Sequence, residues 1–151
     1  MATAQLSTPI GPIEIRADNA TLVSIRMGAS GADLDERPSP LLLEAIAQLD
    51  AWFAHRLRTF SLPLAPSATA RGAALRQAIC EIPYGNTASY GEVAHFAQSG
   101  PRAIGQACRR NPFPIIVPCH RVIAARQAIG YYSGGNGVVT KRWLLEHEQR
   151  A

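Results

Sequence analysis

The fold of the second half of this chain is decided by the stretch 89–111, which reads SYGEVAHFAQSGPRAIGQACRRN. Ser89 and Glu92 have the spacing of a capping box, which predicts a helix over 90–97. A Gln-Ser-Gly break follows, and Pro101 is placed to begin a second helix. Two short helices joined by a glycine-containing turn predict a helix-turn-helix.

The second predicted helix has two distinct faces. Four residues face inward and three polar residues share the outer face: the inner set is Ala103, Ile104, Ala107 and Cys108, and the outer set is Arg102, Gln106 and Arg109. An outer face with two arginines fits contact with nucleic acid. Paired helices with basic faces are also common in proteins that never bind DNA, so this pattern alone leaves both interpretations open.

A candidate nucleophile follows the two helices. The apolar run 115–117, Ile-Ile-Val, predicts a strand that delivers the motif 118–122, Pro-Cys-His-Arg-Val. Cys119 beside His120 suits an activated sulfur nucleophile, because the thiolate is the reactive form and a nearby base can supply it. Taken alone, His120 is more often a satisfied core histidine.

Charge is divided unevenly along the chain. Residues 1–70 carry five arginines against seven carboxylates, a net charge of −2, whereas residues 71–151 carry ten cations against four carboxylates, a net charge of +6. Only Lys141 among those ten is not arginine, the residue suited to forked contacts with phosphate. The surplus favours a nucleic-acid partner, although a surplus of this size is weak evidence by itself.

Composition and cysteine use indicate a cytoplasmic globular protein. Hydrophobic residues make up 47% of the chain and charged residues 17%. Cys80, Cys108 and Cys119 are odd in number and widely spaced, which argues against a disulfide framework and against a CxxC zinc site. Cys80 and Cys108 are expected to be small buried hydrophobes. The sequence shows neither a signal peptide nor a run of membrane-spanning length, so no membrane partner is expected.

The first half predicts a small sheet followed by a long helix. Short apolar stretches over 5–26 are broken by turn residues, which is typical of antiparallel strands. Ser39 and Pro40 are a cap and first-turn proline for a helix with apolar residues at helical spacing. The Pro/Ser/Ala-rich segment 61–70 is the candidate domain boundary.

These elements predict an α/β (α+β) fold in two domains. Residues 1–66 are expected to form a supporting α/β domain, and residues 67–151 a mostly helical domain that binds DNA and carries the acceptor cysteine. The second domain should begin with a helix marked by Leu75, Ala78, Ile79 and Ile82, which Pro83 stops.

The chain resembles the 6-O-alkylguanine-DNA alkyltransferases, also called methylated-DNA–protein-cysteine methyltransferases. The resemblance covers most of the chain and is carried by Ile82-Pro83-Tyr84-Gly85, Ser89-Tyr90-Gly91-Glu92-Val93-Ala94, Arg109-Arg110-Asn111-Pro112, Ile116-Val117-Pro118-Cys119-His120-Arg121-Val122, Tyr132-Ser133-Gly134-Gly135 and the segment from Lys141 to Glu148. The Pro-Cys-His-Arg-Val motif is the most specific of these. Thr8-Pro9-Ile10-Gly11-Pro12 and the segment from Phe60 to Leu64 resemble the family's N-terminal domain.

The resemblance implies a reaction without a cofactor. The alkyl group on the guanine oxygen of a flipped nucleotide would pass to the Cys119 sulfur, and the protein would act once per molecule. His120 would serve as base through a bridging water, with Glu148 orienting the imidazole. Asn111 matches the active-site asparagine, and its amide could hold the turn that presents the cysteine. The Tyr90 hydroxyl would give a proton or hydrogen bond to the ring nitrogen of the departing guanine.

The resemblance also assigns substrate contacts. Ser133 would contact the guanine oxygen, the backbone carbonyls of Cys119 and Val122 would bind its exocyclic amine, and Tyr132 and Gly134 would shape the pocket. Arg102 matches the arginine that fills the gap left by the flipped nucleotide, in a helix that enters the minor groove. Three further arginines are expected at the substrate or DNA: Arg109, Arg110 and Arg121.

The chain also departs from the family pattern. The link 96–101 is about two residues shorter than usual, and the segment 136–140 is about two residues longer. The N-terminal part has no cysteine that could hold the structural zinc of some relatives, so no metal is expected. Two alternatives remain: an alkyltransferase-like protein that binds the lesion without repairing it, although such proteins lack the cysteine, and a cysteine hydrolase without DNA affinity. No obligate protein partner is indicated.

Overall fold

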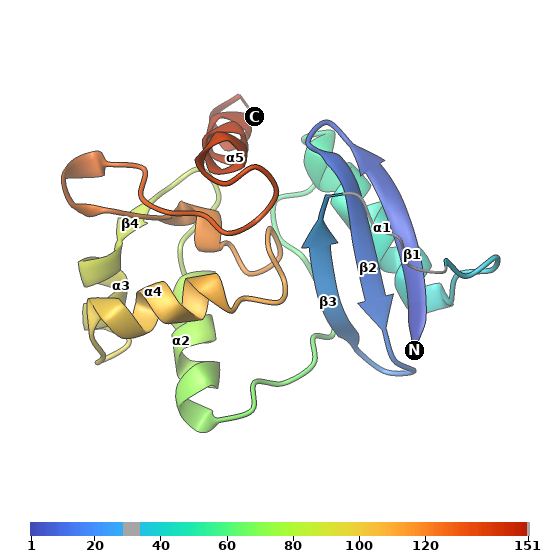
Figure 1. Cartoon of the computed structure of the whole chain (residues 1–151), viewed down its shortest axis with the longest axis horizontal. Coiled ribbons are helices and arrows are strands. Elements are labelled where there is room, and N and C mark those ends of the chain that lie inside the picture. Colours follow the sequence, from blue (N-terminus) through green and yellow to red (C-terminus); the bar gives the residue numbers. More distant parts are fainter. Residues whose placement is uncertain (29–33, 151) are drawn as a thin grey trace. The chain divides into compact units, whose positions relative to one another are not determined.

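The computed structural model describes residues 1–28 and 34–150. The chain forms two compact units, Met1–Ala65 and Pro66–Ala151 (Figure 1). Within the described residues, no helix combines the length and apolar character needed to cross a membrane. The expected mixed α/β fold, with a sheet and helix first and a mostly helical part second, is confirmed.

The N-terminal unit is an antiparallel sheet with one helix packed on it. Strands β1 (Ala2–Thr8), β2 (Gly11–Ala17) and β3 (Leu22–Met27) lie in that order, and α1 (Pro40–Phe53) packs against β1 and β2 (Figure 1). As expected, the Ser39 side chain caps α1, accepting a hydrogen bond from the backbone N–H of Leu42 at 3.3 Å. The core is built from apolar residues with no exposed surface: Ile13, Ile15, Leu22, Leu42, Leu49 and Trp52.

The C-terminal unit is mostly helical. Its elements in chain order are α2 (Ala70–Cys80), β4 (Ala88–Ser89), α3 (Tyr90–Phe96), α4 (Pro101–Arg109), the 3₁₀ helix η1 (Cys119–Arg121), β5 (Val122–Ile123), the 3₁₀ helix η2 (Ala125–Gln127) and α5 (Val138–Gln149). Helix α2 begins five residues before Leu75, because the Thr69 side chain caps it by accepting a hydrogen bond from the Gly72 N–H.

Helices α3 and α4 form the expected helix-turn-helix. The capping box is complete: the Glu92 N–H donates to Ser89 Oγ at 3.0 Å, and the Ser89 N–H donates to Glu92 Oε1 at 3.0 Å. Pro101 lies in the first turn of α4, and Ile104 packs inward with no exposed surface. Ile104 therefore anchors α4 while the arginines of the same helix stay on its surface.

A short parallel ladder connects the helix-turn-helix to the cysteine motif. Ala88 pairs with Val122 and Ser89 with Ile123, so strand β4 runs beside strand β5. Because Ser89 is also the cap of α3, the start of that helix is fixed to the backbone that immediately follows η1. Two segments more than thirty positions apart in sequence are thereby held together.

Two expectations are wrong. The run 115–117 is a buried turn rather than a strand: the Val117 N–H donates to the Phe113 carbonyl at 2.8 Å, and Ile115 has a φ of 75°. Pro112 and Pro114 before this run and Pro118 after it have no N–H to give to a sheet. Cys80 is exposed rather than buried, because Ile79 occupies the inner face of α2 and the next helical position lies about 100° around the axis.

Candidate active site

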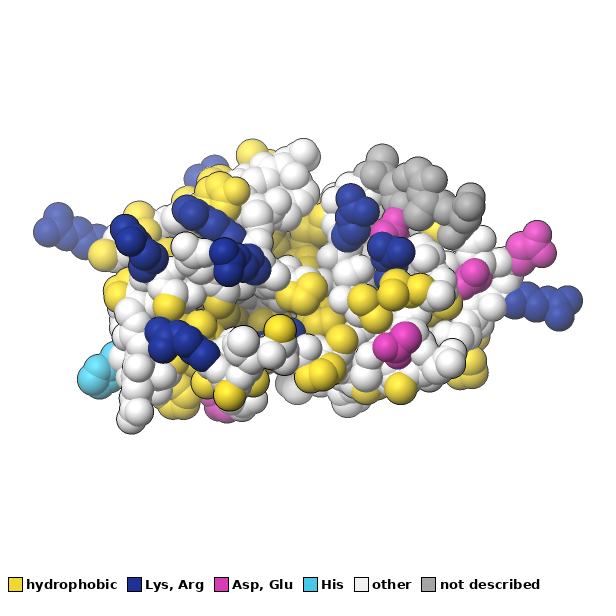
Figure 2. Space-filling model, turned by 60° about the horizontal axis from the view of Figure 1, so that its bottom comes forward, with side chains coloured by type: hydrophobic (Ala, Val, Ile, Leu, Met, Phe, Trp, Pro, Cys, Tyr) yellow, Lys and Arg dark blue, Asp and Glu magenta, His cyan; other side chains and the backbone are white. Residues whose placement is uncertain are grey.

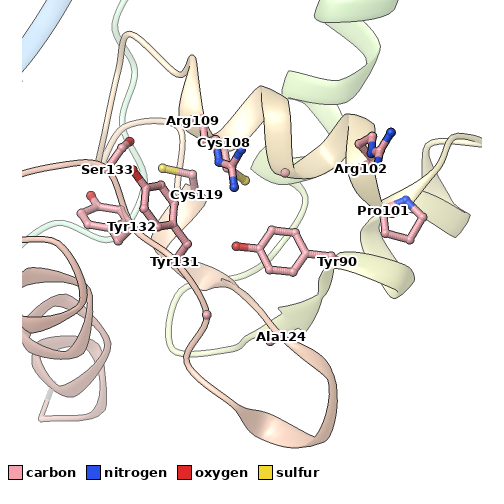
Figure 3. Close-up of a pocket in the computed structure, with 12 residues that line it drawn as sticks. Tyr90, Pro101, Arg102, Cys108, Arg109, Cys119, Ala124, Tyr131, Tyr132 and Ser133 are labelled. Carbon is pink, nitrogen blue, oxygen red and sulfur yellow. The ribbon is translucent and has the colours of Figure 1, made fainter.

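Cys119 lies in the wall of a pocket of about 430 Å³ in the C-terminal unit (Figure 3). The cysteine begins η1 and is 6% exposed. The pocket is lined from three directions: by Tyr90 at the start of α3, by one face of α4, and by the loop that leads from β5 to α5. The helix-turn-helix and the cysteine motif therefore build one site.

Asn111 clamps the turn that precedes Cys119. Its Nδ2 donates to the Val117 carbonyl at 2.9 Å and lies 3.2 Å from Cys119 Sγ, and its Oδ1 accepts from the Phe113 N–H at 2.9 Å. The side chain thus joins both ends of the turn and also contacts the sulfur. This clamp holds Ile115 in its left-handed conformation, which costs a β-branched residue on the order of 1–3 kcal/mol.

The thiol of Cys119 is protonated at rest. Burial raises its pKa, and the hydrogen bond from Asn111 and the charge of Lys141 only partly oppose this. A protonated thiol is a weak nucleophile, so the sulfur needs a base when it reacts. Cys108, in the same pocket, is also held in the thiol form, because burial raises its pKa to about 12.

His120 is paired with Glu148 behind the cysteine. Its Nε2 lies 2.8 Å from Glu148 Oε2, and neither side chain is more than 1% exposed. Burial lowers the pKa of the imidazole despite the raising effect of Glu148, so the ring is neutral at neutral pH and can accept a proton. Because Nε2 faces the carboxylate, the second ring nitrogen, Nδ1, is the atom at which the ring would take up a proton from another group.

Glu148 is fixed by three groups besides the imidazole. Arg121 Nε lies 3.0 and 3.1 Å from its two oxygens, Arg121 Nη2 donates at 2.7 Å, and the N–H of Gly85 donates at 3.1 Å. Burial by itself would raise the pKa of Glu148, but hydrogen bonds from His120 and Arg121 outweigh it and lower the pKa to about 2. The carboxylate stays charged and joins α5 to η1.

The expectation that Arg121 contacts substrate or DNA is corrected by its surroundings. The residue is 6% exposed, its guanidinium makes a fork with Glu148, and its Nη1 donates to the Ile82 carbonyl at 2.8 Å. Desolvated charges persist inside a protein only when they are paired in this way, so the guanidinium is committed to the interior. We call His120, Arg121 and Glu148 the inner cluster.

Lys141 contacts the backbone around the pocket, a role not expected from the sequence. Its ammonium is fully buried and donates to the carbonyls of Val122 at 2.6 Å and Tyr131 at 3.2 Å, so it ties the two ends of the pocket loop together. A signal was present: Lys141 lies three residues before Leu144 and seven before Glu148, which places it on the inner face of α5.

The carbonyls expected to bind the guanine amine each accept one hydrogen bond already. Val122 O accepts from Lys141, and Cys119 O accepts from the Val122 N–H. A carbonyl oxygen has two lone pairs, so each keeps one for a second donor. The Val122 side chain is buried and does not line the pocket.

The two expected tyrosines are hydrogen-bond donors in the pocket wall. Burial raises the pKa of Tyr90, and burial raises the pKa of Tyr132 well above its ordinary value, so both hydroxyls keep their protons. Gly130, with a φ of +74°, leaves room for Tyr90: a Cβ there would lie 3.4 Å from its hydroxyl oxygen. Ser133 lines the pocket, whereas Gly134 does not.

The remaining predicted arginines, in α4 and at its C-cap, line two different hollows. Arg102 and Arg109 are exposed and line the pocket with Cys119, whereas Arg110 lines a different groove together with Arg71 and Arg76 of α2. Figure 2 shows exposed basic side chains distributed over this unit. Among the described residues, no three His, Cys, Asp or Glu side chains gather as metal ligands would.

Two family models together match nearly the whole chain. Residues 1–66 match "6-O-methylguanine DNA methyltransferase, ribonuclease-like domain", and residues 72–150 match "6-O-methylguanine DNA methyltransferase, DNA binding domain". Both match the resemblance inferred from the motifs.

Curated relatives and solved structures agree with the models. The methylated-DNA–protein-cysteine methyltransferase of Mycobacterium leprae is 40% identical over 155 residues, which cover 95% of this chain and 90% of that protein. The constitutive enzyme of the same name from Bacillus subtilis is 41% identical over 117 residues, covering 76% of this chain and 70% of that protein. The crystal structure of Mycobacterium tuberculosis OGT in complex with DNA superposes with a TM-score of 0.85 at 36% identity, covering 100% of this chain and 95% of that one.

Proposed function

Because this chain belongs to the 6-O-methylguanine DNA methyltransferase family, we propose that it repairs duplex DNA by moving the alkyl group of 6-O-alkylguanine onto Cys119. One observation carries the proposal. A buried thiol, contacted by Asn111 and adjacent in sequence to a neutral His120 paired with Glu148, lines a pocket whose other wall is a helix-turn-helix bearing exposed arginines.

The proposed chemistry is a displacement at carbon. The Cys119 sulfur forms a bond to the alkyl carbon as the bond from that carbon to the guanine oxygen breaks, and the electron pair moves into the guanine ring. The thiol proton goes to His120 Nδ1 through a water, and the charged imidazole that results is stabilised by Glu148. The Tyr90 hydroxyl gives its proton to the ring nitrogen of the departing guanine and regains one, through water, from the charged imidazole, so that the net change moves the thiol proton to the guanine ring.

The reaction is proposed to occur once per molecule. Its products are unmodified guanine and an S-alkyl cysteine, and a thioether sulfur is a poor leaving group at neutral pH. No described group is placed to reverse the transfer, and the lesion supplies its own alkyl group, so no cofactor enters the reaction. A thiol acceptor suits a reducing compartment, which agrees with the cytoplasmic location expected from the sequence.

Access to the sulfur requires that the damaged nucleotide leave the duplex. Unstacking a base costs a few kcal/mol, and Arg102, exposed at the first turn of α4, is proposed to fill the gap from the minor groove. Arg109 and Arg110 are also exposed and are proposed to contact phosphates. The N-terminal unit, residues 1–65, is proposed to support this DNA-binding unit.

The test is to locate the transferred group. The protein is incubated with a duplex containing one 6-O-methylguanine, and its peptides are then analysed by mass spectrometry. We expect a single stoichiometric burst of methylation at Cys119, and the Cys119→Ser variant should bind the duplex but transfer nothing. Bound, unrepaired DNA with unmodified wild-type protein would favour the lesion-binding alternative, and repeated turnover on an ester substrate would favour a hydrolase.

A further inference from the structure

Two side chains from opposite walls meet at the rim of the pocket. Tyr131, on the loop between β5 and α5, is 56% exposed and lines the same pocket as Cys119. Arg109, at the end of α4, holds its guanidinium carbon 5.1 Å from the centroid of the Tyr131 ring, a cation–π contact. Figure 3 shows both residues together with the Cys119 sulfur. We call Arg109 and Tyr131 the rim pair.

The Tyr131 backbone is held by a hydrogen bond, whereas the side chains of the rim pair are exposed. The Tyr131 carbonyl accepts a hydrogen bond from the buried Lys141 ammonium, so the Tyr131 ring can rotate without moving the loop. Arg109 is exposed and makes no ion pair with any described residue. The contact across the pocket therefore depends on the attraction between one guanidinium and one ring.

A DNA phosphate competes directly with that contact. An exposed cation–π contact is weak, whereas an arginine–phosphate contact is charge-assisted and often forked. DNA bound against α4 would therefore draw Arg109 away from the ring and release Tyr131. A free alkylated base carries no phosphate and meets the rim pair in place.

We propose that Arg109 and Tyr131 are specificity-determining residues: their contact narrows the mouth of the pocket until DNA engages Arg109, so that the protein selects lesions carried by DNA over free alkylated bases. This inference rests on the proposed function, because it concerns access of the lesion to Cys119. The inference is tested by the ratio of two rates of Cys119 alkylation, one with a free alkylated base and one with the same base in duplex DNA. The proposed function is tested by whether Cys119 reacts at all.

The experiment compares two forms of one lesion. The rate of Cys119 alkylation is measured with free 6-O-benzylguanine in the absence of DNA, and with 6-O-benzylguanine inside a duplex. Tyr131→Ala should raise the free-base rate about two- to fivefold, the factor that an exposed cation–π contact of about 0.5–1 kcal/mol supports. The duplex rate should not rise in proportion, so the selectivity for duplex falls.

Further variants separate a rim contact from a general change in the pocket. Tyr131→Phe keeps the ring and should keep the wild-type selectivity. Arg109→Ala should raise the free-base rate and lower the duplex rate, and the double variant with Tyr131→Ala should react with free base no faster than the faster single variant. Phe96→Ala removes another exposed ring, 65% exposed but outside this pocket, and should leave the free-base rate unchanged.

The outcomes are separable. A free-base rate that stays constant or falls in both Tyr131→Ala and Arg109→Ala would overturn the inference, as would a Tyr131→Phe variant that behaves like Tyr131→Ala. If neither the free base nor the duplex substrate alkylates Cys119 of the wild-type protein, the proposed function is contradicted instead.

Discussion

The two sides of Cys119 are built in opposite ways. On one side lies the inner cluster, in which Glu148 accepts hydrogen bonds from His120, Arg121 and the Gly85 backbone and is almost completely buried. On the other side lies the pocket, whose arginines are exposed and whose rim carries the cation–π contact between Arg109 and Tyr131. The groups proposed to handle the proton are buried and hydrogen-bonded, whereas the groups proposed to meet DNA are exposed.

This difference predicts how substitutions divide. A change in the inner cluster leaves a buried charge without its partner, so it should reduce both the stability of the fold and the rate of transfer. A change on the pocket side removes an exposed group, so it should alter the choice or handling of substrate and leave the free energy of unfolding nearly unchanged.

The largest effect is expected from Glu148→Gln. The substitution leaves the Arg121 guanidinium buried without a carboxylate, so the free energy of unfolding should fall by about 3–5 kcal/mol in a urea titration. Methyl transfer should slow by about 10²–10⁴, because the imidazole loses the group that stabilises its charged form.

Glu146→Gln is the matched control for that variant. Glu146 lies on the same helix but is exposed, and its pair with Arg150 spans 3.6 Å at the surface. Its loss should change the free energy of unfolding by less than about 1 kcal/mol. If the two variants lose the same free energy of unfolding, the inner cluster contributes no more to stability than a surface ion pair.

Acid should weaken the inner cluster next. The pKa of Glu148 is lowered to about 2, so the stability it contributes is complete above its ordinary pKa of 4.5 and is lost as pH falls from there toward 2. The pKa of His120 is also lowered, mainly by burial, so stability already begins to decline as pH falls below 6.5, where the unfolded chain takes up a proton first. Thermal unfolding measured from pH 8 to pH 3 should show both declines, and a transition temperature that rises on acidification would contradict them.

Lys141→Met should have a smaller effect than Glu148→Gln. The variant keeps the length of the side chain but leaves the carbonyls of Val122 and Tyr131 without their shared donor, which should cost about 1–3 kcal/mol of unfolding free energy. The pKa of Cys119 should rise further, because a positive charge near the sulfur is lost, and thiol alkylation followed against pH would detect this. Arg142→Met, at the next and exposed position, serves as the control and should be silent in both measurements.

The smallest change in stability is expected from Arg102→Ala on the pocket side. Transfer from duplex DNA should fall about tenfold, because the gap left by the flipped nucleotide is no longer filled, while transfer from single-stranded DNA, which needs no extrusion, should be unchanged. Unfolding free energy should stay within about 0.5 kcal/mol of the wild-type value. A parallel loss on both substrates would remove Arg102 from the extrusion step.

The local elements of the fold could be predicted because their signals are local. The capping box of Ser89 and Glu92 and the helix-starting Pro101 depend on residues within one helical turn of each other, and the structure reproduces both. The run 115–117 misled because its apolar character fits a strand equally well. Its turn depends on flanking prolines and on contacts that Asn111 makes across six positions of the chain.

The inner cluster was harder to predict because its members meet only in the folded chain. Glu148 lies 28 positions from His120 and 27 from Arg121, and no periodicity connects them. The pairing of His120 with Glu148 could be expected only through the family resemblance, and the pairing of Arg121 with Glu148 was not expected. Arg121, two positions after Cys119, was expected at the substrate or DNA, because the sequence does not show that α5 packs over it and buries its charge.

The ladder between β4 and β5 has a consequence for how this pocket can change. Tyr90 directly follows Ser89, and Cys119 lies three positions before Val122. The paired backbones therefore set the distance between the hydroxyl of the proposed proton donor, Tyr90, and the Cys119 sulfur. The depth of the pocket is therefore set by the main chain, whereas the width of the pocket is set by side chains on the loop 124–137. Variants that accept bulkier lesions should carry changes in that loop and keep the β4–β5 ladder. The substrate range could then broaden while the distance between the Tyr90 hydroxyl and the Cys119 sulfur stays the same.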